Sequence, residues 1–129
     1  MQPERAPFPV ASNWISSLSE DHHGNIWIGT WGGGMTVIKG DELRVYDETN
    51  GLPDLKIRSI KEDMEGNIMI GTNENGLVLF KGEYFISWFE KDGLMDEQVT
   101  SVLQDSYGEY WIGTGKGINR FYPYNQNDR

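Results

Sequence analysis

The chain has 129 residues, with 11 Lys and Arg against 20 Asp and Glu, and its formal net charge is −9. This excess of negative charge argues against a nucleic acid or an anionic membrane as partner. The sequence contains no cysteine, which excludes disulfides, thiolate metal sites and a cysteine nucleophile. No run of residues approaches the roughly 18 apolar residues of a membrane helix, so we expect no membrane contact by this segment.

The chain is predicted to begin with an N-terminal loop or arm over residues 1–12, because Pro7 and Pro9 disfavour a central strand there. Four short strands follow at residues 15–20, 26–30, 35–39 and 42–46. These runs are rich in β-branched and aromatic residues and are bounded by Gly and Asp. Between the first two strands, the sequence predicts a hairpin turn in which Gly24 takes a positive φ and the Asp21 carboxylate accepts backbone N–H groups.

The same pattern then recurs twice. The motif Asp-x-x-Gly-(Asn/Glu)-x-(Trp/Met)-Ile-Gly-Thr starts at Asp21, Asp63 and Asp105, with a constant spacing of 42 residues. Four antiparallel strands in a unit of this length are typical of a β-propeller blade. We therefore predict an all-β chain whose residues 1–129 form a single propeller segment of three blades, at about 13–48, 55–90 and 97–129.

The third unit has a shortened turn, and its register places the fourth strand at residues 125–129, which contain no apolar side chain. We expect this blade to lack its outer strand, or to receive residues 1–5 of a neighbouring copy. Blade faces stack on one another, so Trp27, Met69 and Trp111 are expected to lie in the core between blades.

Three blades are too few to close a ring, because propellers have four to eight. An open wedge would expose apolar faces, which monomers rarely tolerate over large areas. The sequence therefore favours a homo-oligomer, with a dimer closing a six-bladed ring, or a place in a larger repeat array.

The segment from Ser17 to Thr30, followed by a glycine-rich turn and then Asn50-Gly51-Leu52-Pro53, resembles the two-component regulator propeller repeat. The resemblance recurs three times and covers nearly the whole chain. It implies a sensor domain of bacterial hybrid histidine kinases that lies in the periplasm and senses glycan-type or other small ligands. The second unit departs from the pattern at Met69, where Trp is usual, and at Met95, where Pro is usual.

The sequence offers little support for catalysis. The only histidines, His22 and His23, are neighbours in one turn, which is a poor arrangement for a metal site. Ser17 recurs in each unit and lacks the elbow motif of a hydrolase nucleophile. We therefore predict no enzyme activity, no catalytic residue, no metal and no cofactor.

Ligands of propellers usually bind over the central channel, on the face that carries the loops from the second to the third strand and from the fourth strand to the next blade. The residues on this face that depart from the repeat are both aromatic and polar, and such a mixture suits a carbohydrate or another small molecule. The candidate residues, which depart from the repeat, are Trp14, Trp31, Asn73, Glu74, Asn75, Gln98 and Lys116. Two alternatives remain: a propeller lyase or hydrolase of the streptogramin-lyase type, and a purely structural, self-assembling propeller fragment.

Overall fold

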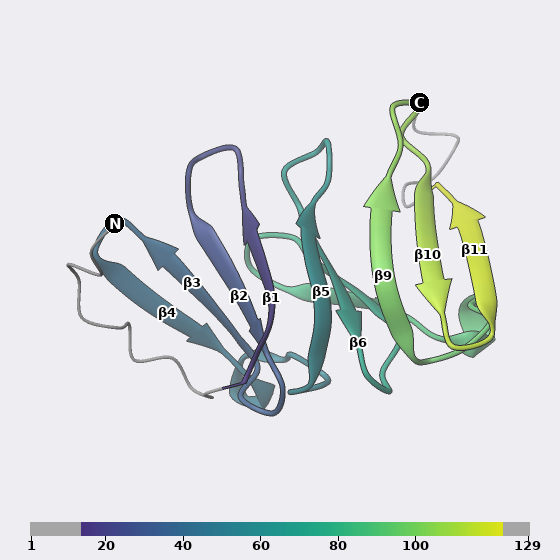
Figure 1. Cartoon of the computed structure of the whole chain (residues 1–129), viewed down its shortest axis with the longest axis horizontal. Coiled ribbons are helices and arrows are strands. Elements are labelled where there is room, and N and C mark those ends of the chain that lie inside the picture. Colours follow the sequence, from purple (N-terminus) through teal and green to yellow (C-terminus); the bar gives the residue numbers. More distant parts are fainter. Residues whose placement is uncertain (1–13, 123–129) are drawn as a thin grey trace.

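The computed structural model describes residues 14–122, which form three antiparallel sheets side by side (Figure 1). The first sheet contains β1 (Ile15–Glu20), β2 (Ile26–Thr30), β3 (Met35–Lys39) and β4 (Glu42–Tyr46). The second contains β5 (Ile57–Glu62), β6 (Ile68–Thr72), β7 (Leu77–Phe80) and β8 (Phe85–Trp88). The third contains β9 (Val99–Gln104), β10 (Tyr110–Thr114) and β11 (Gly117–Phe121).

Strand order within each sheet follows the chain, so every sheet is an up-and-down meander. The first strands of the three sheets, β1, β5 and β9, lie next to one another and form a common inner edge (Figure 1). All four strands predicted in the first repeat have the predicted bounds. The arm at 1–12, its residues 1–5 and the fourth strand of the third blade fall outside the described residues.

The links between blades contain two short 3-10 helices, Glu48–Asn50 and Glu90–Asp92, which the sequence reading treated as loops. The first is capped by Asp47, whose carboxylate accepts the Thr49 N–H at 2.9 Å. Gly51 ends this helix with a φ of 95°, a left-handed conformation that glycine adopts without steric cost.

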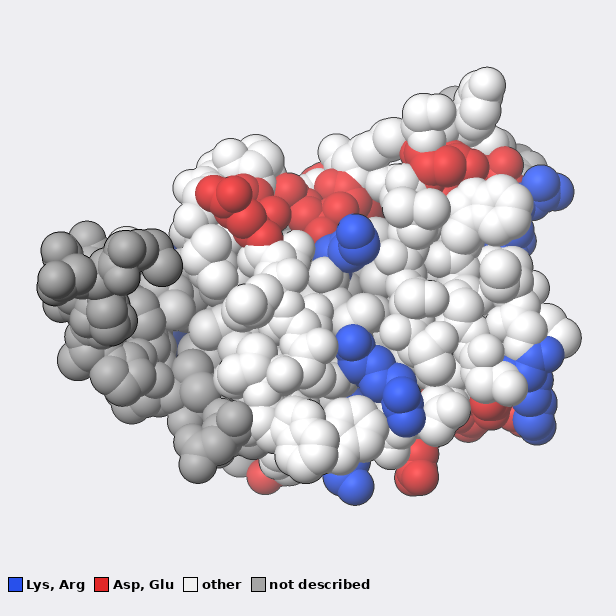
Figure 2. All heavy atoms as spheres, viewed as in Figure 1, with Lys and Arg blue, Asp and Glu red and all other residues white. Residues whose placement is uncertain are grey.

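The turn between the first two strands of each blade is built around its aspartate, as predicted. Asp21 accepts the backbone N–H groups of His23 and Asn25, both at 2.9 Å, and Gly24 has a φ of 83°. Acidic side chains gather along the edge of the molecule at which these turns lie, the upper edge in Figure 2. The backbone of the first turn is therefore held by hydrogen bonds from within the turn.

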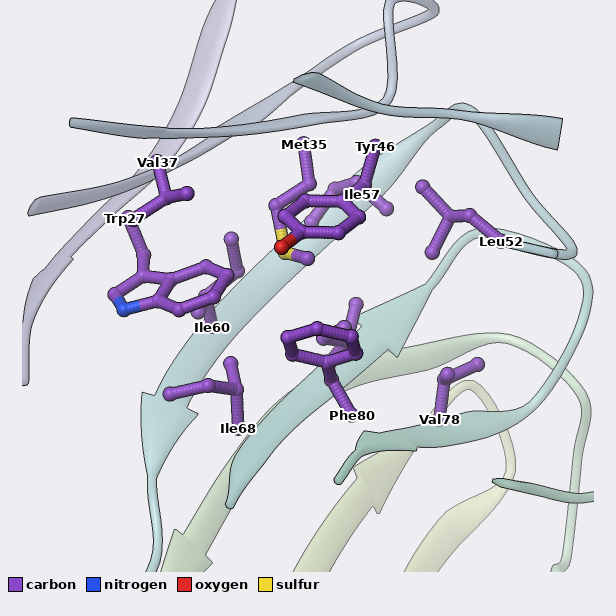
Figure 3. Packing of buried hydrophobic residues seen from close by; sticks show 11 residues of the cluster. Trp27, Met35, Val37, Tyr46, Leu52, Ile57, Ile60, Ile68, Val78 and Phe80 are labelled. Atoms are coloured by element: carbon purple, nitrogen blue, oxygen red, sulfur yellow. The ribbon is translucent and has the colours of Figure 1, made fainter. Parts of the chain in front are cut away.

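Two apolar clusters hold the three sheets together. In the first, Trp27, Met35 and Val37 of one sheet face Ile60 and Phe80 of the next (Figure 3). In the second, the face of the middle sheet packs on β9 and β10 through Met69, Leu77, Leu79, Val99, Val102, Tyr110 and Ile112. Trp27 and Met69 are 4 % and 1 % exposed, which confirms their predicted place between blades.

Glycine in the Ile-Gly-Thr motif permits this close approach. A Cβ on Gly29 would lie 2.7 Å from Cγ2 of Ile57, and one on Gly71 would lie 3.0 Å from Cγ1 of Val99. The first distance is shorter than carbon contacts found in proteins and the second is at their lower limit, so a side chain at either position would require the neighbouring blade to shift.

The two end faces of the wedge differ from the inner faces. Leu18 is 67 % exposed, whereas its repeat counterparts Ile60 and Val102 are 2 % and 3 % exposed. At the other end, Trp111 is only half-buried, so its predicted burial between two blades is wrong for this segment. The physical reason is that no further blade of the described chain packs on that side.

Candidate ligand-binding rim

The predicted ligand residues all lie at one end of the blades, opposite the aspartate turns. Trp14 directly precedes β1, Trp31 follows β2, and the backbone N–H of Trp31 donates to the Trp14 carbonyl at 3.0 Å. In the third sheet, the Gly115 N–H donates to the Gln98 carbonyl at 3.1 Å and so ties the corresponding segments together. We call this end of the inner strands the rim.

The rim has one continuous group of side chains across two blades. The Trp31 ring centroid lies 5.6 Å from Nζ of Lys56 and 5.1 Å from Cζ of Arg58. Arg58 in turn donates from Nε and Nη2 to Oδ1 of Asn73, at 3.1 and 2.8 Å. Two predicted residues, Trp31 and Asn73, are thus brought together through an arginine on β5.

The other predicted residues are not part of this group. The Glu74 N–H donates to Oδ2 of Asp54 at 2.8 Å, and the Asn75 N–H donates to Oγ1 of Thr72 at 3.0 Å. These bonds involve only the backbone of Glu74 and Asn75 and shape the turn that carries Asn73. Lys116 lies in the third sheet, with Nζ 3.9 Å from Oε1 of Glu90.

Lys56 and Arg58 were missed by the sequence reading, although a signal was present. Lys56 occupies the repeat position of Trp14 and Gln98, which were selected because they differ from each other. Arg58 occupies the repeat position of Ser16 and Thr100, and it is the only positively charged residue among these three. Such a departure on the inner strand is as informative as one in a loop.

The opposite end, at the aspartate turns, has a different character. The His22 N–H donates to Oε1 of Glu62 at 2.8 Å, and the His22 ring contacts the other carboxylate oxygen. In the next pair of blades, the Met64 N–H makes the same bond to Oε1 of Gln104 at 2.6 Å. These bonds fasten each turn to the adjacent inner strand, which is a structural role.

Two turn aspartates, Asp21 and Asp105, are held as ionised acceptors. Burial raises the pKa of Asp21, but the bonds from Trp27 Nε1, at 2.9 Å, and from Asn25 and His23 outweigh it and leave the pKa below its ordinary value. The bond from Trp111 Nε1, at 2.8 Å, likewise lowers the pKa of Asp105. A carboxylate stabilised in its charged form is a poor general acid.

Asp63 finds its donor elsewhere, because Met69 replaces the tryptophan of its own blade. The hydroxyl of Tyr110 on β10 donates to Oδ2 of Asp63, so the donor comes from the next blade. Within residues 14–122, no three His, Cys, Asp or Glu side chains are grouped as a metal ion would require. No helix of the described part is long and apolar enough to cross a membrane.

Four-stranded meanders that stack face to face along a common inner edge are the blades of a β-propeller. The chain belongs to the two component regulator propeller family, whose pattern matches residues 9–32, 51–74 and 93–116, together more than half of the sequence. No curated protein sequence matches the chain.

Two similar solved structures are extracellular domains from B. thetaiotaomicron. One, assigned to the hybrid two component system BT3049, is 28 % identical with a TM-score of 0.76, over 86 % of this chain and 16 % of that one. The other, assigned to the one component system BT4673, is 26 % identical with a TM-score of 0.75, over 89 % and 18 %. The chain therefore spans less than a fifth of the length of either protein.

A streptogramin B lyase is also similar in fold, with a TM-score of 0.65 over 92 % of this chain and 43 % of the lyase. Its sequence identity is 13 %, so the likeness concerns the arrangement of blades alone.

Proposed function

We propose that the chain is a non-enzymatic ligand-sensing or scaffolding segment of the periplasmic part of a bacterial two-component sensor, with a glycan-type or other small ligand bound at the rim over the channel. The family and the two extracellular relatives support the sensor context and the compartment. The observation that carries the ligand-binding part is the contact group of Trp31, Arg58 and Asn73, which joins two blades beside the inner strands.

A ligand bound to this group would touch two blades at once. Trp31 belongs to the link between β2 and β3 of the first blade, whereas Arg58 on β5 and Asn73 after β6 belong to the second blade. Any ligand that bridges them favours the blade arrangement that fits it best, and a sensor can transmit such a population shift. An aromatic ring, an amide and charged donors in one place are also the groups that recognise sugars.

The contacts of the acidic turns favour a non-enzymatic role. General acid and base catalysis needs groups of suitable pKa that converge on a cleft, whereas Asp21 and Asp105 are engaged in hydrogen bonds within their own turns. The two histidines lie at the end of the blades opposite the rim. A lyase mechanism therefore has fewer suitable groups here than ligand binding has.

For assembly, we propose that the two open faces pack against a second copy, and that two copies complete a six-bladed ring. Leu18 and Ile15 on one face are exposed although their counterparts Ile60 and Ile57 are buried. The other face carries a cavity of about 270 Å³ lined by Leu103, Trp111 and Ile118. Each inner interface joins the same two faces of the repeat, so we expect the open face of the first blade to fit the open face of the third.

Light scattering during size-exclusion chromatography, over a dilution series, tests the assembly. A dimer of twice 14.7 kDa is expected, and Leu18→Glu should convert it to a monomer. Tyr84→Glu is the matched control and should leave the mass unchanged, because Tyr84 is 55 % exposed in the turn between β7 and β8 of the middle blade and lies on neither open face. A wild-type monomer at every concentration would contradict the ring.

Ligand binding at the rim is tested by calorimetric titration with neutral and acidic oligosaccharides. Trp31→Ala should lower the affinity for every ligand that binds. Trp14→Ala tests the neighbouring predicted position. The thermal midpoint of each variant is the control for folding. Unchanged affinity in Trp31→Ala for all ligands found would remove Trp31 from the site.

A further inference from the structure

Lys56 and Arg58 place two positive charges beside the ring of Trp31, and neither has an acidic partner within residues 14–122. Within residues 14–122, the ion pairs are His22–Glu62, Arg44–Glu42, Lys116–Glu90 and Arg120–Glu109. Lys56 and Arg58 belong to none of them, although acidic residues outnumber basic ones by 20 to 11.

The acidic group nearest in sequence is already engaged. Asp54 accepts the Lys56 N–H through Oδ1 at 3.0 Å and the Glu74 N–H through Oδ2 at 2.8 Å. These backbone bonds hold the carboxylate in the loop, and within residues 14–122 it forms no ion pair with Lys56 or Arg58. The side-chain ammonium of Lys56 instead lies above the indole ring of Trp31.

Arg58 is positioned by a neutral group. Two of its nitrogens donate to the amide oxygen of Asn73, which fixes the plane of the guanidinium without neutralising it. A guanidinium has five N–H donors, so further donors remain for another acceptor. Had this partner been Asp or Glu, the charge would have been balanced inside the protein.

Two cations beside one aromatic ring repel each other, and the quadrupole of the ring offsets only part of that repulsion. Lys56 is exposed and Arg58 is half-buried, so both are reachable from solvent at the rim. An anionic group placed between them would relieve the repulsion and receive charge-assisted hydrogen bonds from both.

We propose that Lys56 and Arg58 form a subsite for an anionic substituent of the ligand, a carboxylate or a sulfate, next to the ring of Trp31. The ligand class is then an acidic oligosaccharide. This inference rests on the proposed ligand-binding function of the rim, but it makes the separate claim that charge, in addition to the sugar ring, decides the affinity.

The experiment is an NMR titration of the Trp31 indole N–H at constant ionic strength, with four probes. These are digalacturonic acid, its dimethyl ester, a sulfated galactobiose and inorganic sulfate. The acid should bind at least about tenfold more tightly than the ester, because a charge-assisted hydrogen bond contributes more than a neutral one. Tighter binding of digalacturonic acid than of sulfated galactobiose would assign the subsite to carboxylates, and the reverse order to sulfates.

The variants Lys56→Gln and Arg58→Gln should each abolish the preference for the acid. Lys91→Gln is the matched control, because Lys91 also lies over an aromatic ring, 5.8 Å from the centroid of Phe89, but away from Trp31. Arg58→Lys keeps the charge and removes the two-pronged geometry, so it should retain part of the preference. A purely structural role for these residues would lower the thermal midpoint and leave the preference intact.

The possible failures are distinguishable. Equal binding of the acid and the ester would overturn the anionic subsite while leaving sugar binding in place. If no sugar binds but inorganic sulfate shifts the Trp31 signal in wild type and not in Lys56→Gln, the subsite is supported and the sugar ligand is wrong. If neither the sugars nor sulfate shift that signal, the subsite is overturned.

Discussion

The interface between the first and second blades and that between the second and third bury the same kind of surface with different chemistry. In the first, Asp21 is bonded by Trp27 of its own blade, and the indole also packs against the next sheet. In the second, Met69 fills the indole position and Asp63 is bonded by Tyr110 of the next blade. In both turns Oδ1 accepts backbone N–H groups of the same turn, whereas Oδ2 accepts from an aromatic side chain of its own blade in one case and of the next blade in the other.

This difference shows that the hydrogen bonding of a turn aspartate can depend on a side chain of the neighbouring blade. Asp63 is 5 % exposed, and a buried carboxylate without donors is costly. The loss of a tryptophan in one repeat is therefore matched by a tyrosine in the next, where the other repeats have Ile26 and Ile68. We therefore expect the stability of each blade to depend on its contacts with the adjacent blade.

The largest expected effect is at Trp27. Trp27→Ala should lower the free energy of unfolding by roughly 3–5 kcal/mol, because it removes a buried ring and the donor of Asp21. Trp111→Ala removes the same residue type from a half-buried site, so in a monomer it should lower the free energy of unfolding clearly less than Trp27→Ala does. Chemical denaturation of both variants measures the difference. Equal losses in a dimeric sample would instead indicate that Trp111 is buried against a second copy.

Tyr110→Phe should cost about 1.5–3 kcal/mol, because it deletes only the hydroxyl that donates to the buried Asp63 carboxylate. Tyr107→Phe, on an 82 % exposed ring, is the control and should have almost no effect. In the double variant with Met69→Trp, the new indole can donate to Asp63 and should restore part of the loss. Strict additivity of the two substitutions would argue against the exchange of donors.

The substitutions Gly71→Ala and Gly113→Ala compare an interface between two blades with the open face of the third blade. At Gly71, the added methyl would lie 2.8 Å from Oγ of Ser59 in its own blade and 3.0 Å from both Cγ1 and the carbonyl oxygen of Val99 in the next, so we expect the free energy of unfolding to fall by roughly 1–3 kcal/mol. At Gly113, the equivalent methyl meets mainly the side chain of Ser101 in its own blade, which is exposed and can rotate. The thermal midpoint should fall further for Gly71→Ala than for Gly113→Ala.

The smallest effect appears only in acid. The folded-state pKa of Asp21 lies below its ordinary value of 3.8, so the stabilisation by this carboxylate is present above that value and is lost as the pH falls through the folded-state pKa. Asp21→Asn cannot accept from Trp27 through its amide nitrogen and should be less stable at neutral pH. The gap in unfolding free energy between wild type and this variant should narrow below about pH 4, and a constant gap would contradict the assignment.

Much of the fold could be predicted because the signals are local and repeated. Strand bounds, the aspartate turn and the burial of Trp27 and Met69 all follow from alternation, turn residues and the spacing of 42. The short 3-10 helices were missed because their few residues carry weak signals. Trp111 was misplaced because burial of a repeat residue depends on whether a neighbouring blade is present.

At the rim, the sequence pointed to Trp31 and Asn73 but could not connect them. Their partner Arg58 lies on an inner strand, and only the packing of the first sheet beside the second brings it over the indole. The sequence also hid the bond from Tyr110 to Asp63, which replaces the indole donor that is absent at Met69, because Asp63 and Tyr110 belong to different blades.

The sequence by itself thus determined the repeat, the strands and the family, because these depend on periodicity and local turn chemistry. The tertiary structure decided which side chains meet across blades, which faces stay open and where unpaired charge accumulates. Those properties depend on the stacking of whole sheets, where a contact joins residues about 27 to 47 positions apart.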